Sequence, residues 1–164
     1  MIIIERIKPQ TALVFKDVRL RALLDSPTAF SSTYVKEVQF PDEEWMKRSV
    51  RWSSDGSAIF LAMDGDAGCG MICAFEEEGR QRAQLISMWV DPGFRRAGVG
   101  KLLIEAVVDW VHSRGVRELK LMVTSVNEGA IAFYRRLGFQ MTGKTGVYPN
   151  DATITEYEMV RGLH

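Results

Sequence analysis

Apolar residues recur along the chain with two different periods, and these periods predict helices and strands in a definite order. A first strand is predicted over residues 2–7, and helical spacing follows over residues 12–24. This helix should end near Pro27, because the residue before a proline disfavours the helical conformation. A loop is expected over residues 29–40, and a short helix with an acidic first turn should begin after Pro41.

The middle of the chain changes to short apolar runs separated by polar turns. Residues 58–63 and 70–75 flank the sequence Asp-Gly-Asp-Ala-Gly at residues 64–68, which is a strong hairpin signal. A second polar turn over residues 76–81 leads to another run at residues 82–90. Three consecutive antiparallel strands are therefore expected.

The last third of the chain alternates helices and strands. Apolar positions over residues 98–114 follow a period of about 3.6 residues, and a glycine at position 115 supplies the stop. A buried strand is predicted over residues 119–123 and a helix over residues 127–137. Two strands then complete the pattern, at residues 139–142 and 153–160. This order is typical of an α/β protein with a mixed sheet packed by helices.

Length, composition and charge narrow the class of protein. A chain of 164 residues allows one domain, 1–164, without a comfortable division into two. No apolar run approaches the roughly 20 residues that cross a bilayer, and the apolar start of the chain meets charged residues at once, unlike a signal peptide. Lys plus Arg equals Asp plus Glu, 21 each, so the net charge gives no support for nucleic-acid binding. We expect a cytoplasmic protein that binds no membrane.

Cysteines and histidines are few. Cys69 and Cys73 share a face if their segment is a strand, and such positions do not close easily into a disulfide, so buried reduced thiols are expected. His112 and His164 lack the Cys/His grouping that zinc sites need. We predict no metal site.

A basic turn with two glycines precedes the long helix that starts near residue 98. Gly98 and Gly100 let the backbone approach a ligand without an intervening Cβ. The free N–H groups and the dipole of the helix suit a pyrophosphate, and Arg95, Arg96 and Lys101 add positive charge. The alternative is a solvated basic loop that only caps the helix. The nicotinamide and nucleoside-triphosphate glycine patterns are both absent.

A second segment, at residues 127–139, reads Asn-Glu-Gly-Ala-Ile-Ala-Phe-Tyr-Arg-Arg-Leu-Gly-Phe. Asn127 is a good N-cap, and an apolar stripe with helical spacing includes Phe133 and Leu137, which we assign to the core. Tyr134 neighbours this stripe and carries a hydroxyl that needs a partner if it is buried. On its own, such a tyrosine is more often a packing residue.

The two segments together resemble the GNAT superfamily of acyl-CoA-dependent N-acetyltransferases. The first carries R-x-x-G-x-G at residues 95–100, preceded by Val-Asp-Pro, and the second carries N-x-x-A-x-x-F-Y-x-x-x-G-F. The resemblance covers residues 58–160. It implies a mostly antiparallel central sheet of about seven strands flanked by about four helices, with an acetyl-CoA-binding core over 58–160 and acceptor-side helices over 1–56.

The resemblance also implies roles for individual residues toward acetyl-CoA as cosubstrate. The backbone of residues 88–90 should pair with the pantetheine arm, the amides of residues 96–101 should hold the pyrophosphate, and a backbone N–H near Val90 should stabilise the oxyanion. Tyr134 would be the general acid toward the coenzyme sulfur. The predicted coenzyme-binding residues are Met88, Trp89, Val90, Arg95, Arg96, Ala97, Gly98, Val99, Gly100, Lys101, Asn127 and Tyr134.

The general base stays open at this stage. Many members of the family place a glutamate on the central strand where this chain has Gln84, which takes up no proton at physiological pH. A water chain or one of the carboxylates Glu76, Glu77 and Glu78 could serve, although such a run is usually a solvated turn.

The predicted acceptor is a primary amine of a small molecule, such as a polyamine or an amino-acid derivative. Residues 21–30 look like a segment of small bacterial members of the family, some of which acetylate polyamines. Glu37, Glu43 and Glu44 could attract a cationic amine or could form an exposed acidic helix start. The alternatives are a non-catalytic acyl-CoA-binding module and an acetyltransferase of protein N-termini or lysines. A homodimer is expected through a sheet edge such as residues 153–160.

Overall fold

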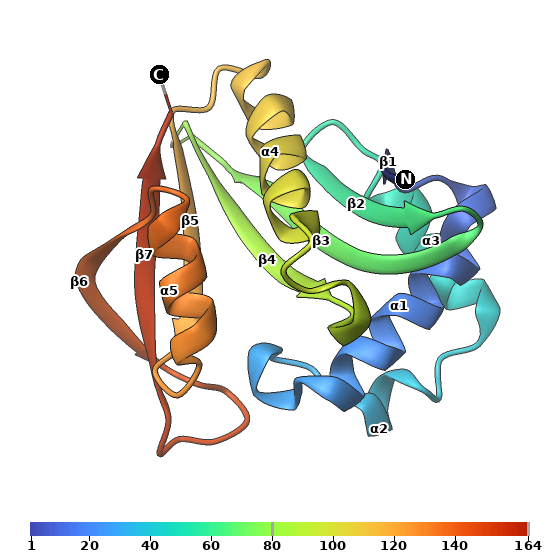
Figure 1. Ribbon diagram of the computed structural model, residues 1–164, viewed down its shortest axis with the longest axis horizontal. Coiled ribbons are helices and arrows are strands. Elements are labelled where there is room, and N and C mark those ends of the chain that lie inside the picture. Colours follow the sequence, from blue (N-terminus) through green and yellow to red (C-terminus); the bar gives the residue numbers. More distant parts are fainter. Residues whose placement is uncertain (80, 164) are drawn as a thin grey trace.

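The computed structural model describes residues 1–79 and 81–163 of the chain. Two points of the sequence analysis fall on the other positions, namely Arg80 in the predicted 76–81 turn and the isolation of His164, and both lie outside the described residues. The described part forms one seven-stranded sheet with helices on both faces (Figure 1). The sheet order is β1-β2-β3-β4-β5-β7-β6.

The order of elements follows the predicted one. The strands are β1 (Ile2–Arg6), β2 (Ser57–Asp64), β3 (Ala67–Glu77), β4 (Arg82–Val90), β5 (Glu118–Thr124), β6 (Gln140–Val147) and β7 (Thr155–Gly162). The α-helices are α1 (Ala12–Asp25), α2 (Tyr34–Glu37), α3 (Asp42–Arg51), α4 (Val99–His112) and α5 (Glu128–Arg136). Short 3-10 helices lie at Pro9–Thr11, Pro27–Ala29 and Pro92–Phe94.

The expected loop over residues 29–40 is partly wrong, because it contains the single turn of α2. Thr33 caps this turn, since its side-chain oxygen accepts the backbone N–H of Lys36 at 3.3 Å. The described residues therefore form five α-helices, where about four were expected.

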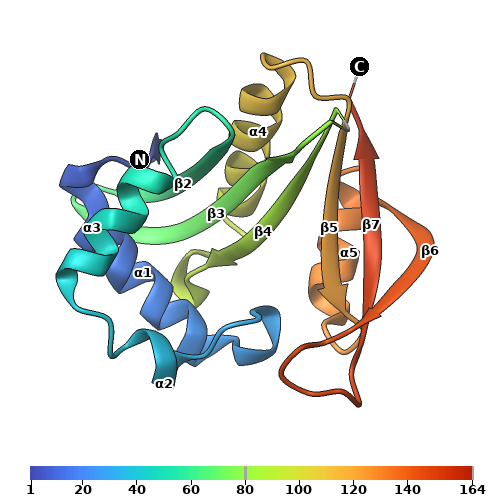
Figure 2. The ribbon, with the colours of Figure 1, turned by 180° about the vertical axis from the view of Figure 1, so that it is seen from behind.

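The helices divide between the two faces of the sheet. α4 and α5 cover one face, and α1 and α3 lie on the other, as Figure 2 shows from behind. Leu103 and Val107 of α4 are fully buried on the first face. On the second face Phe15 and Val18 of α1 pack with Trp45 of α3, whose ring centroid lies 5.7 Å from that of Phe15. Helical spacing in the sequence predicted these buried residues, but it also predicted an apolar side of α3 with Met46 and Val50, which are exposed.

A β-bulge corrects the prediction that Cys69 and Cys73 share a face. Met63 of β2 pairs with Gly68 and Ala62 pairs with Gly70, so Cys69 is the extra residue between them. The bulge shifts the alternation of side chains, and Cys69 packs under α4 while Cys73 packs on the α1 side. Both are free, buried thiols, as expected.

A gap in the sheet opens between β4 and β5. These parallel strands pair only from residues 82–84 to residues 118–120, and beyond this point they diverge (Figure 1). A second bulge lies in β4, where Ser87 and Met88 together face Ile72 of β3 and Ser87 has a φ of 55°. Because a bulge bends its strand, it favours this early separation from β5.

The strand at residues 153–160 is not a sheet edge, which corrects the interface expected from the sequence. β7 pairs with β5 on one side and with β6 on the other, so the edge strands of the described sheet are β1 and β6. A β-strand's position in a sheet depends on distant partners, which the sequence pattern does not reveal. The homodimer stays a prediction, but the strand at residues 153–160 cannot supply the free edge proposed for its interface.

Candidate active site

A cavity of about 1000 Å³ occupies the gap between β4 and β5. Its walls include residues from the α5 side of the sheet and residues from the opposite side, so it passes through the sheet. The predicted site residues that line it are Met88, Trp89, Val90, Arg95, Arg96, Gly98, Gly100, Lys101, Asn127 and Tyr134. Ala97 and Val99 do not line it, and the side chain of Val99 is only 1% exposed in the core.

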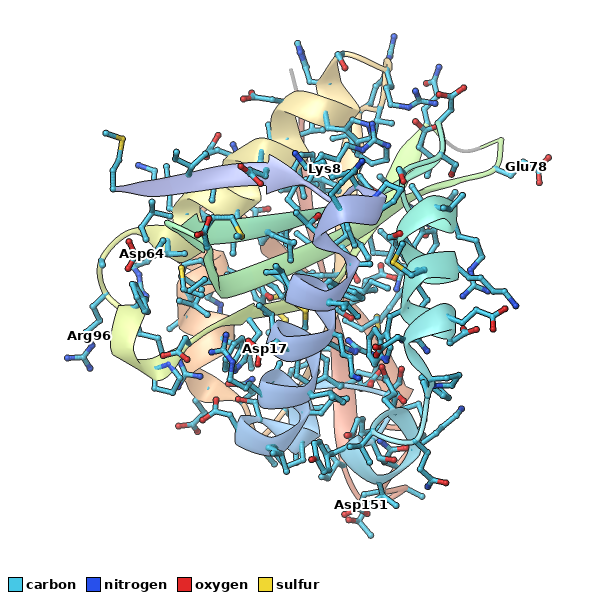
Figure 3. All side chains as sticks on the ribbon, turned by 90° about the vertical axis from the view of Figure 1, so that its right-hand side faces the viewer. Lys8, Asp17, Asp64, Glu78, Arg96 and Asp151 are labelled. Atoms are coloured by element: carbon cyan, nitrogen blue, oxygen red, sulfur yellow. The ribbon has the colours of Figure 1, made fainter. Side chains whose placement is uncertain are left out.

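Glycine is required at the two positions of the basic turn for different structural reasons. Gly98 is the N-cap of α4 with a φ of 81°, and a Cβ placed there would meet no atom within 4 Å. Its backbone is therefore open to a ligand. A Cβ at Gly100 would lie 2.9 Å from Met88 Cε and 2.9 Å from Phe133 Cζ. The second glycine thus allows α4, β4 and α5 to converge. Figure 3 shows Arg96 pointing outward from this turn.

Arg95 is held by the protein rather than left free for an anion. Its Nε donates to the carbonyl oxygen of Val90 at 2.9 Å, and its Nη2 donates to Asp25 Oδ2. Trp89 Nε1 donates to the same carboxylate oxygen at 2.9 Å. The hydrogen bond from Trp89, with those from Ser26 and Arg95, lowers the pKa of Asp25 against the opposing effect of burial. Asp25 therefore fastens the basic turn to the end of α1.

Asp25→Asn should lower the melting temperature by about 2–4 °C at neutral pH, because it removes the ion pair with Arg95, which stabilises by about 1 kcal/mol. The folded-state pKa of Asp25 is depressed, so this stabilisation is present above the unfolded-state pKa and is lost as the pH falls through the folded-state pKa. Thermal unfolding at neutral and acidic pH should show a difference that disappears in acid. Asp17→Asn is the control, since its ion pair with Arg21 is exposed.

Tyr134 reaches across the gap in the sheet. The residue is 8% exposed, its ring packs against Phe133 and Phe139 with centroids 5.4 Å and 5.6 Å away, and its hydroxyl lies 3.6 Å from Met88 Sδ of β4. Burial raises the pKa of Tyr134 well above its usual value. The hydroxyl therefore keeps its proton and can donate it into the cavity.

The apolar stripe of α5 is rotated by one position from the predicted one. Ile131 and Tyr134 are its buried residues, while Phe133 and Leu137 are half-buried and line the cavity. Assigning the latter two to the core was therefore only partly right. The gap between β4 and β5 leaves their side of the helix partly exposed.

The backbone of β4 offers a donor to the cavity. Asp91 donates its N–H to the carbonyl oxygen of Cys69 in β3 at 2.8 Å. Successive N–H groups along a strand point to opposite edges, so the N–H of Val90 points away from β3, into the gap. This geometry supports a role for Val90 as a hydrogen-bond donor there.

The carboxylates considered from the sequence lie away from the cavity. Glu76 pairs with Arg114, and Glu77 pairs with Arg82 at 2.8 Å and Lys120 at 3.2 Å. None of residues 76–78 lines the cavity, and Figure 3 shows Glu78 pointing outward at the tip of the β3–β4 turn.

The glutamates that the sequence suggested for attracting the acceptor also form ion pairs elsewhere. Glu37 is 1% exposed and is neutralised by Arg19 and Arg48, at 3.0 Å and 2.8 Å. Glu43 and Glu44 pair with basic residues of α3, and neither lines the cavity. Gln84 does line it. The sequence therefore did not identify the acid–base partner of Tyr134.

Two loops, the covering loops, meet at the wall of the cavity. The hydroxyl of Tyr148, in the β6–β7 loop, lies 2.8 Å from the carbonyl oxygen of Pro27 and 2.6 Å from that of Phe30. Asn150 Nδ2 also donates to the Phe30 carbonyl at 3.3 Å. Tyr148 and Phe30 line the cavity. The sequence analysis missed this contact because its residues lie about 120 positions apart.

Two further properties concern the described residues as a set. They contain no group of three or more His, Cys, Asp or Glu side chains that could hold a metal ion. No helix among them has the length and apolar character that a membrane span requires.

Comparisons with known proteins identify relatives of the chain. A family model described as the acetyltransferase (GNAT) family matches residues 20–139. The [ribosomal protein bS18]-alanine N-acetyltransferase of Salmonella typhimurium is 43% identical over 68 residues, which cover 41% of this chain and 46% of that protein. Streptothricin acetyltransferase of Streptomyces lavendulae is 34% identical over 110 residues, which cover 65% of this chain and 58% of that protein.

An uncharacterized N-acetyltransferase of Methanocaldococcus jannaschii is 40% identical over 81 residues, covering 49% of this chain and 33% of that protein. The chain therefore spans between 33% and 58% of the length of these curated relatives.

Solved structures share the fold at low sequence identity. An acetyltransferase of Streptococcus pneumoniae has a TM-score of 0.81 at 22% identity and full coverage of both chains. PaiA N-acetyltransferase of Thermoplasma acidophilum, in complex with coenzyme A, has a TM-score of 0.78 at 18% identity and covers 99% of both chains. The fold that the two sequence motifs implied is confirmed.

Proposed function

The chain belongs to the GNAT acetyltransferase family, and from this premise we propose that it transfers the acetyl group of acetyl-CoA directly to a primary amine of a small molecule. One observation carries the proposal. A single cavity crosses the sheet, and its walls include the basic turn at the start of α4, Tyr134 beside the gap, and Tyr148, which joins the two covering loops.

The residues around the basic turn fit a coenzyme pyrophosphate. Gly98 leaves open space at the N-terminus of α4, and the first amides of a helix have no partner within that helix. Arg96, Lys101 and Arg136 also line the cavity and supply positive charge. Beyond Gln84, the edge of β4 facing β5 pairs with no strand of the described residues and can pair with the pantetheine arm.

The catalytic steps that follow from this arrangement use three groups of the chain. The N–H of Val90 stabilises negative charge on the acetyl oxygen, and Tyr134 protonates the departing thiolate. Asn127 lines the cavity near the start of α5 and contacts the pantetheine or an adjacent water. Transfer is direct, so no cysteine acts as nucleophile. Burial raises the pKa of Cys73 to about 12, which keeps its thiol protonated.

Tyr148 joins the two covering loops at the cavity, and we expect this contact to favour a small amine over a protein chain. We expect Tyr148→Phe to raise KM for the acceptor about 3- to 10-fold, since one hydrogen bond between the two covering loops is lost. KM for acetyl-CoA should stay unchanged. Steady-state kinetics with each substrate varied in turn measures both values. Tyr157→Phe, outside the cavity, is the control, and equal shifts in both variants would contradict the role of Tyr148.

A protein acceptor is the second candidate, because one relative is named for acetylating the alanine of a ribosomal protein. A panel of polyamines, amino-acid derivatives and alanine-initiated peptides, assayed with acetyl-CoA by thiol release, tests the proposal. We expect turnover with small amines. Turnover confined to peptides would replace the small-molecule acceptor, and coenzyme binding without any turnover would support a non-catalytic module. A cytoplasmic location and a homodimer remain predictions.

A further inference from the structure

Glu156 is the one carboxylate that lines the cavity among residues 1–79 and 81–163. It lies on β7, opposite Thr124 of β5 and Gly146 of β6. Its neighbours along the strand settle which face it occupies. Met159 and Tyr157 pack toward α4 and α5, so Glu156 faces the opposite side, where none of the described α-helices covers β5 and β7 (Figure 2). This is the side on which the covering loops lie.

The carboxylate of Glu156 differs from its acidic neighbours because it lacks a partner within the described part of the chain. Glu158, two residues along the same face, accepts a hydrogen bond from Thr142 at 3.0 Å and lies 3.9 Å from Lys120. Glu156 forms no hydrogen bond or ion pair with any described residue. Burial alone raises its pKa. A cationic ligand would supply the missing partner.

One close neighbour of Glu156 is apolar. A Cβ at Gly146 would lie 3.5 Å from Met122 Cε and 4.0 Å from Glu156 Oε2, so the thioether and the carboxylate lie side by side. No charged side chain of the surrounding described elements forms an ion pair with Glu156 within 4.0 Å. The charged and titratable groups of these elements are Lys120, Glu158, Lys144, Tyr148, Arg136 and, across the cavity, Arg19. Arg19 is already bound to Glu37 and Ser87.

We propose that Glu156 is the general base of this enzyme: its carboxylate binds the ammonium group of the acceptor and removes a proton from it before the amine attacks. The inference rests on the proposed acetyltransferase function. Glu156 occupies the acceptor face of the cavity, while Tyr134 extends from α5 on the other face, so a base and an acid act from opposite sides of the sheet.

The proton balance of the reaction closes with these two residues. The acceptor enters as an ammonium ion and gives one proton to Glu156, which frees the nitrogen lone pair. The C–N bond forms and the C–S bond breaks, and the nitrogen releases its second proton to water. The leaving sulfur takes the proton of Tyr134, which regains one from solvent. Glu156 then returns its proton to water. In total the amine loses two protons, the thiol gains one through Tyr134, and the solvent gains one.

The test compares Glu156→Gln with Glu158→Gln, a matched substitution on the same face of β7. We expect Glu156→Gln to lower kcat/KM for the amine at neutral pH by about 100- to 10,000-fold, the usual contribution of a general base. The loss should shrink at high pH, where the free amine predominates, so the pH profile changes shape. Affinity for acetyl-CoA, measured by calorimetry, should stay unchanged. Glu158→Gln should keep the parent's pH profile.

Thermal unfolding excludes a structural explanation. The folded-state pKa of Glu156 is raised, so its ionisation costs stability as the pH rises from the unfolded-state pKa through the folded-state pKa. Glu156→Gln should therefore melt no earlier than the parent at neutral pH.

Three outcomes overturn the proposal. A parent-like pH profile in an active Glu156→Gln variant would show that Glu156 is not the base and would leave the proposed acetyltransferase function intact. A higher acceptor KM with an unchanged profile would make Glu156 an ammonium anchor only. A parent protein that binds acetyl-CoA but acetylates no amine would contradict both the proposed function and the role of Glu156 as its base.

Discussion

Tyr134→Phe should lower kcat by about 10- to 1,000-fold, the usual contribution of general acid catalysis when the leaving group is already fairly good. The substitution removes one oxygen and keeps the ring that packs against Phe133 and Phe139. Within the described residues, the hydroxyl has one contact, with Met88 Sδ at 3.6 Å, which is too weak to hold the fold together. The melting temperature and the acetyl-CoA affinity should therefore change little.

The measurement separates a chemical role of Tyr134 from a packing role. The values of kcat, KM for acetyl-CoA and melting temperature are determined on one preparation. Met88→Leu is the control, because it removes the sulfur beside the hydroxyl and keeps a side chain of similar size. We expect its kcat to stay within a few-fold of the parent's, about 1 kcal/mol or less in activation free energy. A kcat of Tyr134→Phe within about twofold of the parent's would remove Tyr134 from the mechanism.

Gly98→Glu should abolish useful binding of acetyl-CoA, and comparison with Gly98→Gln isolates the electrostatic part of that loss. Both side chains have similar size, and both would occupy the open space at the N-terminus of α4 with the same backbone at a φ of 81°. The left-handed conformation costs each variant about 1–2 kcal/mol of stability. The glutamate alone adds a negative charge where a pyrophosphate is expected.

Calorimetric titration with acetyl-CoA measures this difference. We expect Gly98→Gln to raise Kd about 10-fold and Gly98→Glu to raise it about 100-fold further, because like charges about 4 Å apart near a protein surface repel by several kcal/mol. The gap between the two variants should narrow at high salt. Equal Kd values in the two variants, or an unchanged Kd in a folded Gly98→Glu variant, would remove the pyrophosphate from this turn.

Local patterns in the sequence were sufficient for most helices and strands. The strand predicted at residues 82–90 has the same bounds as β4, and the helix predicted at residues 12–24 differs from α1 by one residue. These elements are set by local signals, namely helical and strand periods, turn glycines and helix caps. Each signal involves residues close together in the sequence, so it can be recognised without knowing the tertiary structure. The two motifs at residues 95–100 and 127–139 likewise carried the prediction of the coenzyme turn and of Tyr134 as the acid.

Contacts between distant segments were not predictable in this way. Bulges decided which face Cys69 occupies and where β4 leaves β5, and pairing with β6 placed β7 inside the sheet. Each depends on which strand lies alongside, and that partner comes from elsewhere in the chain. A helical turn at Tyr34–Glu37 was missed because four residues carry too little periodicity to predict.

The sequence by itself determined the family and the order of elements, because the signals for them lie within continuous segments. It also predicted the acid of the proposed reaction from one such segment. Only the tertiary structure decided the acceptor side. Glu156, Tyr148 and Asp25 lie outside the two sequence motifs. A charged residue on a strand is also usually solvated, so the sequence offers no reason to single out Glu156. Their importance comes from what surrounds them. The hydroxyl of Tyr148 contacts carbonyl oxygens about 120 positions away, and Asp25 binds Trp89 of β4 and Arg95 of the basic turn. Glu156 is distinctive because folding half-buries it in a cavity wall without an ion-pair partner among the described residues, and this environment exists only once the sheet has formed.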